Sequence, residues 1–120
     1  MQTLDLYKNR HYSLLKLSDG IQYKMPNEYT VEEVERLIEL KVKQEYLEKQ
    51  EVNESIVVLQ KMEFFRNIFD QLEIIFQHYQ PDITSEYLKK ILTENEALDV
   101  IGFFVKYRQT YFKTDSKKKV

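Results

Sequence analysis

Residues 58–79, with the sequence VLQKMEFFRNIFDQLEIIFQHY, carry the clearest structural pattern in the chain. Apolar side chains recur there at spacings of 4, 3, 4, 3, 4 and 3, at Val58, Met62, Phe65, Phe69, Leu72, Phe76 and Tyr79. This spacing matches the period of an α-helix and predicts a long helix with one strongly apolar face. Asn53 is a candidate N-cap and Pro81 would end the helix, so we expect it to cover residues 54–80.

The length of this apolar stripe makes self-association a prediction of the sequence. We expect the shorter helices of the chain to cover part of the stripe, and any remainder to pair with a second copy. The residues assigned to self-association are those of the stripe itself: Val58, Met62, Phe65, Phe69, Leu72 and Phe76.

A second helix is predicted directly upstream, over residues 30–52. Thr30 and Glu33 have the spacing of a capping box, in which each side chain bonds the backbone of the other residue. Residues 31–54 hold 8 Glu against 4 Lys and Arg, which indicates a solvated amphipathic helix. Its apolar positions follow at helical spacing: Val31, Val34, Leu37, Ile38 and Val42.

The first 26 residues predict a small β-hairpin. Two short runs rich in strand-forming residues, 12–17 and 21–25, flank an Asp19-Gly20 pair of the kind that favours tight turns. Ile21, Tyr23 and Met25 alternate onto one face, and Leu15 and Leu17 are expected to join it. An isolated hairpin is marginally stable in water, so this one is expected to rest on the helices.

Two shorter helices are predicted after Pro81, over residues 84–92 and 94–112. Asp82 or Thr84 would cap the first, and a Thr93–Glu96 capping box would open the second. Residues 114–120 are predicted to form a disordered basic tail. The expected fold is therefore mainly α, with a small N-terminal β-hairpin followed by about four helices in one domain over residues 1–113.

Composition excludes several classes of protein. Gly and Pro number 2 each among 120 residues, which argues against folds that need many tight turns or Gly-rich loops. The absence of Cys excludes disulfide scaffolds, Cys-ligated metals and thiol catalysis. The opening residues lack the features of a secretory signal, and no apolar run approaches the length of a membrane span. We therefore expect a cytoplasmic protein that does not enter membranes.

The sequence offers no candidate catalytic, cofactor-binding or metal site. His11 and His78 lack partners at metal-ligand spacing, and a solvated or partly packed histidine is the simpler interpretation of both. Paired carboxylates occur at helix starts, where capping and the helix dipole already account for them. No phosphate-binding loop or nucleophile motif is present. We expect a protein that is not an enzyme and needs no cofactor.

Positive charge is concentrated at the C-terminus. Residues 1–100 hold 12 basic and 19 acidic residues, whereas residues 101–120 hold 6 basic residues and 1 acidic residue. Basic residues interleaved with aromatic ones can bind single-stranded nucleic acid, so a small phage or bacterial regulator that binds nucleic acid through residues 103–119 is the alternative function. The net charge of −2 provides no overall attraction to phosphates, which makes this the weaker reading.

Read in order, these segments resemble the tail assembly chaperones of long-tailed bacteriophages. The similar stretches are the strand pair LKLSDGIQYKMP over residues 15–26, the capped helix start TVEEVERL over 30–37, the stretch PDITSEYL over 81–88 and the closing apolar helix. The resemblance is one of pattern, without an invariant motif. It implies a non-enzymatic assembly factor of the host cytoplasm that binds the tape-measure protein, recruits tail-tube subunits and is absent from the finished virion.

The C-terminal helix is the expected partner-binding element. Tape-measure proteins are long and largely helical, and helix-in-groove binding needs apolar anchors at helical spacing. A terminal helix can shift without disrupting the rest of the core, and tyrosine hydroxyls tolerate exposure between binding events. The residues assigned to partner binding are Phe104, Tyr107, Tyr111 and Phe112.

Overall fold

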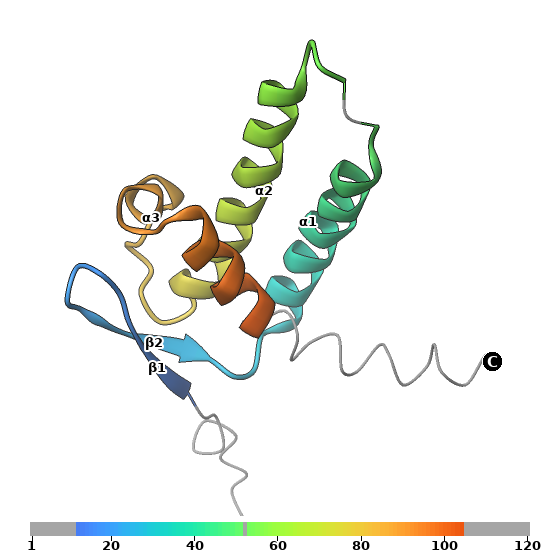
Figure 1. The fold of residues 1–120 in the computed structure, drawn as a ribbon. Helices are drawn as coiled ribbons and strands as arrows, with labels where there is room; N and C mark the ends of the chain where they lie inside the picture. Colours follow the sequence, from blue (N-terminus) through green and yellow to red (C-terminus); the bar gives the residue numbers. More distant parts are fainter. Residues whose placement is uncertain (1–11, 52, 105–120) are drawn as a thin grey trace, which may run out of the picture.

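The computed structural model describes residues 12–51 and 53–104 and has a mainly α fold. Two strands, β1 (Tyr12–Lys16) and β2 (Gln22–Pro26), form an antiparallel hairpin. The helices α1 (Val31–Lys49), α2 (Val57–Gln77) and α3 (Ser85–Ile91) follow, and residues 94–104 form a fourth helical segment (Figure 1). This confirms the predicted class of a small hairpin followed by four helices. The predicted tail over 114–120 lies outside the described residues.

The hairpin turns at the position that the Asp-Gly pair predicts. Gly20 has a φ of +81°, a conformation that glycine adopts without steric cost. Leu17, Tyr23 and Met25 are buried and Leu15 is partly buried, so four of the five residues expected on the inner face lie there. Ile21 is 50% exposed because it belongs to the turn, one residue before β2 begins.

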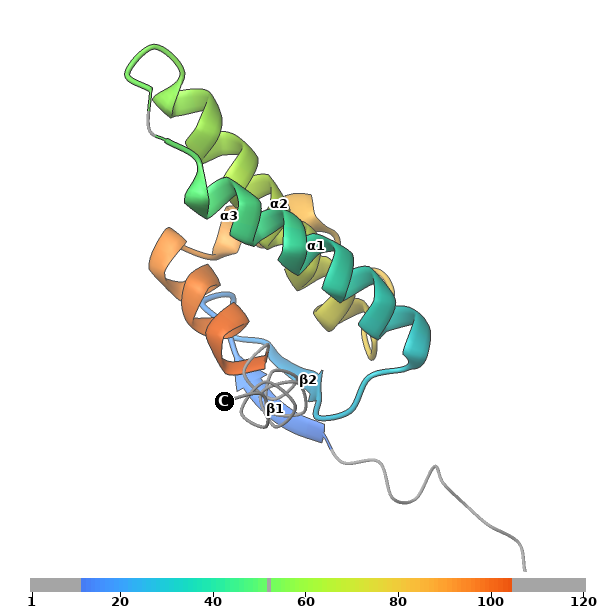
Figure 2. The same ribbon diagram turned by 90° about the vertical axis from the view of Figure 1, so that its right-hand side faces the viewer.

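Helices α1 and α2 form a helical hairpin that projects away from the sheet (Figures 1 and 2). The capping box at the start of α1 is present: the Thr30 N–H donates to the Glu33 carboxylate at 2.8 Å, and the Glu33 N–H donates to the Thr30 hydroxyl at 3.2 Å. The prediction that Asn53 caps α2 is wrong. Its side chain instead accepts from the Ser55 N–H in a turn, and α2 begins only after Ile56.

The core forms around the C-terminal half of α2. Ile68, Leu72, Ile75 and Phe76 are fully buried there. The Phe76 ring meets the Tyr23 ring of β2 edge to face, with the ring centroids 5.5 Å apart. The other elements contribute further buried side chains to the same cluster: Met25, Leu37, Leu88, Leu92, Ala97, Val100, Ile101 and Phe104.

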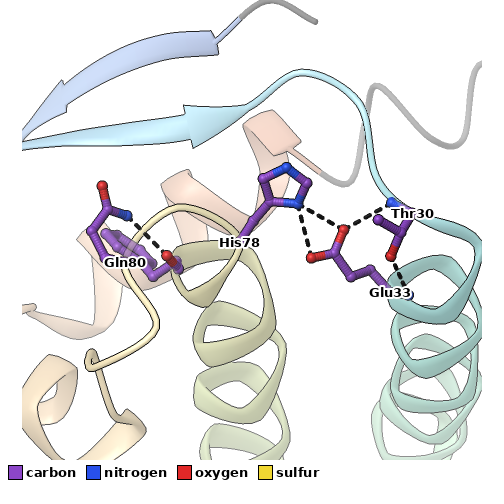
Figure 3. Close-up of polar contacts among 5 residues, drawn as sticks. Thr30, Glu33, His78 and Gln80 are labelled. Atoms are coloured by element: carbon purple, nitrogen blue, oxygen red, sulfur yellow. Dashed lines mark hydrogen bonds and ion pairs between the residues drawn. The ribbon is translucent and has the colours of Figure 1, made fainter. Parts of the chain in front are cut away.

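Polar contacts clamp the end of α2 to the start of α1 and to the sheet. The His78 Nδ1 atom lies 2.7 and 2.8 Å from the two oxygens of the capping-box residue Glu33 (Figure 3). The Gln80 side chain accepts from the Lys24 N–H at 2.8 Å and donates to the Lys24 carbonyl at 3.1 Å, which covers the free edge of β2. The same amide donates to the Phe76 carbonyl at 2.8 Å (Figure 3).

A buried polar layer joins α1 and α2 halfway along their length. The Gln71 Nε2 donates to the Gln44 Oε1 at 2.8 Å and to the Asn67 Oδ1 at 2.7 Å. The Asn67 Nδ2 donates to the Leu40 carbonyl at 3.0 Å. Buried polar groups need their partners, so sliding one helix along the other would break these bonds and leave the groups unsatisfied. The layer therefore fixes the register of the two helices.

The hairpin turn is tied to α3 through one carboxylate. The Asp19 Oδ2 accepts from the Tyr23 hydroxyl at 2.5 Å and from the Tyr87 hydroxyl at 2.8 Å. The hydrogen bond from Tyr23, with smaller contributions from the Ile21 N–H and Tyr87, lowers the pKa of Asp19. Burial and the bond to Asp19 raise the pKa of Tyr23.

We expect Asp19→Asn to reduce the acid dependence of stability. The pKa of Asp19 is lower in the folded than in the unfolded chain, so its contribution is present above the unfolded pKa and is lost as the pH falls through the folded one. The stability difference between wild type and Asp19→Asn should shrink below about pH 4, measured by thermal unfolding across pH. Tyr87→Phe, which removes one of the two hydroxyl donors, should give a smaller change of the same sign. A stability difference that is constant with pH would contradict this.

Phe69→Ala is expected to lower the free energy of unfolding by about 3–5 kcal/mol, because this side chain is only 5% exposed. Met62→Ala is the matched control on the same helix. Its side chain is 53% exposed, so the loss should be below about 1 kcal/mol. Urea unfolding followed by circular dichroism measures both values. Equal losses for the two variants would show that α2 is not divided into a buried and an exposed half.

Candidate partner-binding surface

The N-terminal half of α2 presents apolar side chains to solvent. Val58 is 68% exposed, Leu59 60% and Met62 53%, and Ile56 and Val57 are also exposed. This half of the helix lies beyond the buried polar layer, on the part of the helical hairpin that extends past the core (Figure 2). Exposed apolar residues gathered at one end of a helix are typical of a binding site.

An apolar groove of about 520 Å³ lies between this half of α2 and the end of α3. Its floor is formed by Val58, Met62, Phe65 and Phe69 of α2, together with Leu92, which follows α3. Residues 58, 62, 65 and 69 share one helical face, which explains why they line a single groove. Phe69 is buried at its inner end, while Val58 and Met62 are exposed at its outer end.

Charged side chains border the groove. Lys61 and Lys89 contribute two positive charges and Glu94 one negative charge. The Lys61 Nζ lies 3.3 Å from a Glu94 carboxylate oxygen, and both side chains are more than half exposed. A solvated pair of this kind contributes little to stability, so a partner could replace it at small cost. The Thr93–Glu96 capping box, which is present as predicted, sets Glu94 in the first turn of the fourth helix.

The residues assigned to self-association fall into two groups in the structure, three that are buried in the core and three that line the groove. Phe69, Leu72 and Phe76 are 5%, 0% and 0% exposed, so they are not available to a second copy, and the assignment is wrong for these three. They are covered by the hairpin and the other helices, which close over the C-terminal half of α2. Val58, Met62 and Phe65 remain at the groove, where a partner can reach them.

The structure also corrects one residue assigned to partner binding. Phe104 is 4% exposed and belongs to the core rather than to a binding face. The reason is the spacing of Ala97, Val100, Ile101 and Phe104, which places all four on the inward face of the fourth helix. Tyr107, Tyr111 and Phe112 lie outside the described residues, as do positions 105–119 of the basic segment.

Sequence reasoning missed the residues from other elements that complete the groove. Lys89, Leu92 and Glu94 come from α3 and the segment after it, and nothing in their local pattern indicates that they face α2. The one signal in the sequence was the length of the apolar stripe, which the shorter helices could not be expected to cover completely. His78 is partly packed, in agreement with the simpler interpretation, and His11 lies outside the described residues.

No group of three or more His, Asp or Glu side chains in residues 12–51 and 53–104 is arranged to hold a metal ion. No helix in that same part of the chain is long and apolar enough to cross a membrane.

Comparisons with known proteins gave no match. No protein-family model, curated protein or solved structure is significantly similar to this chain.

Proposed function

We propose that this chain is a non-enzymatic tail assembly chaperone that binds an amphipathic helix of a phage tape-measure protein in the groove between α2 and α3. The observation that carries the proposal is the groove itself, with its floor of apolar α2 residues at helical spacing. The resemblance of residues 15–26, 30–37 and 81–88 to that class of chaperone supplies the identity of the partner.

The shape and chemistry of the groove suit a helix. Helix-in-groove recognition uses apolar anchors at i, i+3 or i+4, and i+7 that enter an apolar groove on the partner. Val58, Met62 and Phe65 offer about two helical turns of apolar surface, enough for two or three such anchors. A tape-measure helix would be shielded there until the tail-tube subunits enclose it.

The charges around the groove favour one kind of helix. Lys61 and Lys89 flank the apolar floor, so acidic residues beside the apolar stripe of the bound helix would be attracted. Glu94 lies next to Lys61 and would favour a basic residue at that end of the groove. Charges at the border of an interface mainly affect the rate of association and the choice of partner.

Other parts of the assignment remain predictions. Tyr107, Tyr111 and Phe112 stay candidates for additional partner contacts, and recruitment of tail-tube subunits in the host cytoplasm belongs to the same proposal. The rival function, binding of nucleic acid through residues 103–119, also stays a prediction, because positions 105–119 lie outside the described residues.

The proposal is tested by co-expressing this chain with the phage tape-measure protein that it is proposed to bind. The tape-measure protein should co-purify with the wild-type chain, and Met62→Glu should abolish this by placing a charge on the apolar floor. Leu14→Glu is the matched control, because Leu14 is a similarly exposed apolar residue (59%) on the outer side of β1. Circular dichroism would verify that both variants are folded.

Two outcomes would count against the proposal. Equal co-purification with Met62→Glu and Leu14→Glu would remove the groove from the binding site. Co-purification of nucleic acid in place of the tape-measure protein, lost at high salt and on deletion of Lys117–Lys119, would favour the rival function.

A further inference from the structure

Helix α1 carries apolar residues outside the face that packs on α2. Leu37 and Gln44 are buried against α2, whereas Ile38, Val42 and Tyr46 are 37%, 62% and 64% exposed. At about 100° per residue, Ile38 lies about 100°, Val42 about 140° and Tyr46 about 180° around the helix from Leu37. These three residues form an apolar row on the outer face, at positions i, i+4 and i+8, that the packing of the monomer does not use.

On the outer face of α1, apolar residues lie at equal distances on the two sides of Val42. Charged residues also lie at equal distances from Val42, and their charges are opposite. Ile38 and Tyr46 lie four residues to either side of Val42, and Glu35 and Lys49 lie seven residues to either side. Seven residues are nearly two helical turns, so both charged residues lie within about 20° of Val42 on the same face. Both are exposed.

We propose that this face binds the same face of a second copy of the chain, with the two α1 helices antiparallel and the two-fold axis at Val42. Val42 then meets Val42 of the second copy, and Ile38 lies beside Tyr46 of that copy. Glu35 faces Lys49 of the other chain, and this contact forms twice because the interface is symmetric. A parallel arrangement would instead place like charges together at both ends.

The remaining charges favour the same register. Glu39 and Lys43 are exposed along one edge of the row, and the antiparallel arrangement brings Glu39 of each copy alongside Lys43 of the other. Moving one helix by four residues, so that Ile38 faced Val42, would place Glu35 opposite Glu45. Charge complementarity therefore selects both the direction and the register of the pair.

The proposed interface is separate from the groove and goes beyond the proposed function. α2 lies between α1 and α3 in Figure 1, so a contact through the outer face of α1 leaves the groove between α2 and α3 accessible. One pair of short helices buries less than the roughly 1,600 Å² of a standard interface. We therefore expect a dimer that forms in a concentration-dependent way rather than an obligate one.

Sedimentation equilibrium of the full chain at increasing concentration, up to about 1 mM, tests the inference. Wild type should dimerise, and Val42→Asp should abolish the dimer. Glu35→Lys and Lys49→Glu, each of which creates two like-charge contacts, should each raise the dissociation constant about ten-fold. The two changes combined in one chain restore opposite charges and should return the constant towards the wild-type value. Met62→Glu, in the groove, is the control and should dimerise as wild type does.

Several results would overturn the inference. They are a wild-type chain that stays monomeric throughout the concentration range, a dimer that survives Val42→Asp, and a combined charge variant that is weaker than either single one. Loss of the dimer in Met62→Glu alone would place self-association in the groove. If Val42→Asp fails to fold, the charge variants decide the outcome, because they alter only exposed residues.

Discussion

Burial of the C-terminal half of α2 is the interaction on which the rest of the structure depends. Ile68, Leu72, Ile75 and Phe76 lose their contact with water by packing against the sheet, α1 and the later helices. The β-hairpin would be marginal by itself, and Tyr23 and Met25 give it a stable position on this part of α2. The apolar face of α2 continues for about three more turns beyond this core, and the described chain leaves that continuation open.

Polar contacts set the ends of the packed region and thereby position the open surface. At one end, Glu33 closes the capping box of α1 and also binds His78 at the end of α2. In the middle, Gln71 joins α2 to Gln44 of α1 inside the interface. Because these contacts fix the two helices along their length, the distal part of α2 is held in place without being covered. A preformed apolar surface of this kind binds with a smaller entropic cost than one that must first be ordered.

Features that depend on neighbouring residues could be predicted from the sequence. The capping boxes at Thr30 and Thr93 and the turn at Gly20 are set within a few residues, and all three are present. Contacts between distant residues could not be predicted. The bond between His78 and Glu33 spans 45 residues, and no local pattern encodes it. Ile38 and Val42 follow at helical spacing but are exposed. The sequence shows that the helix carries apolar residues, but it does not show which face of the helix packs on α2.

Native-state hydrogen exchange along α2 tests most directly whether the helix is divided into a core half and an open binding half. In the free protein, amides of residues 68–76 should exchange only through global unfolding, whereas those of residues 58–65 should exchange faster through local opening. Addition of the tape-measure protein should slow exchange in residues 58–65 and leave residues 68–76 unchanged. Equal protection along the whole helix in the free protein, or partner-dependent protection confined to residues 68–76, would contradict the account.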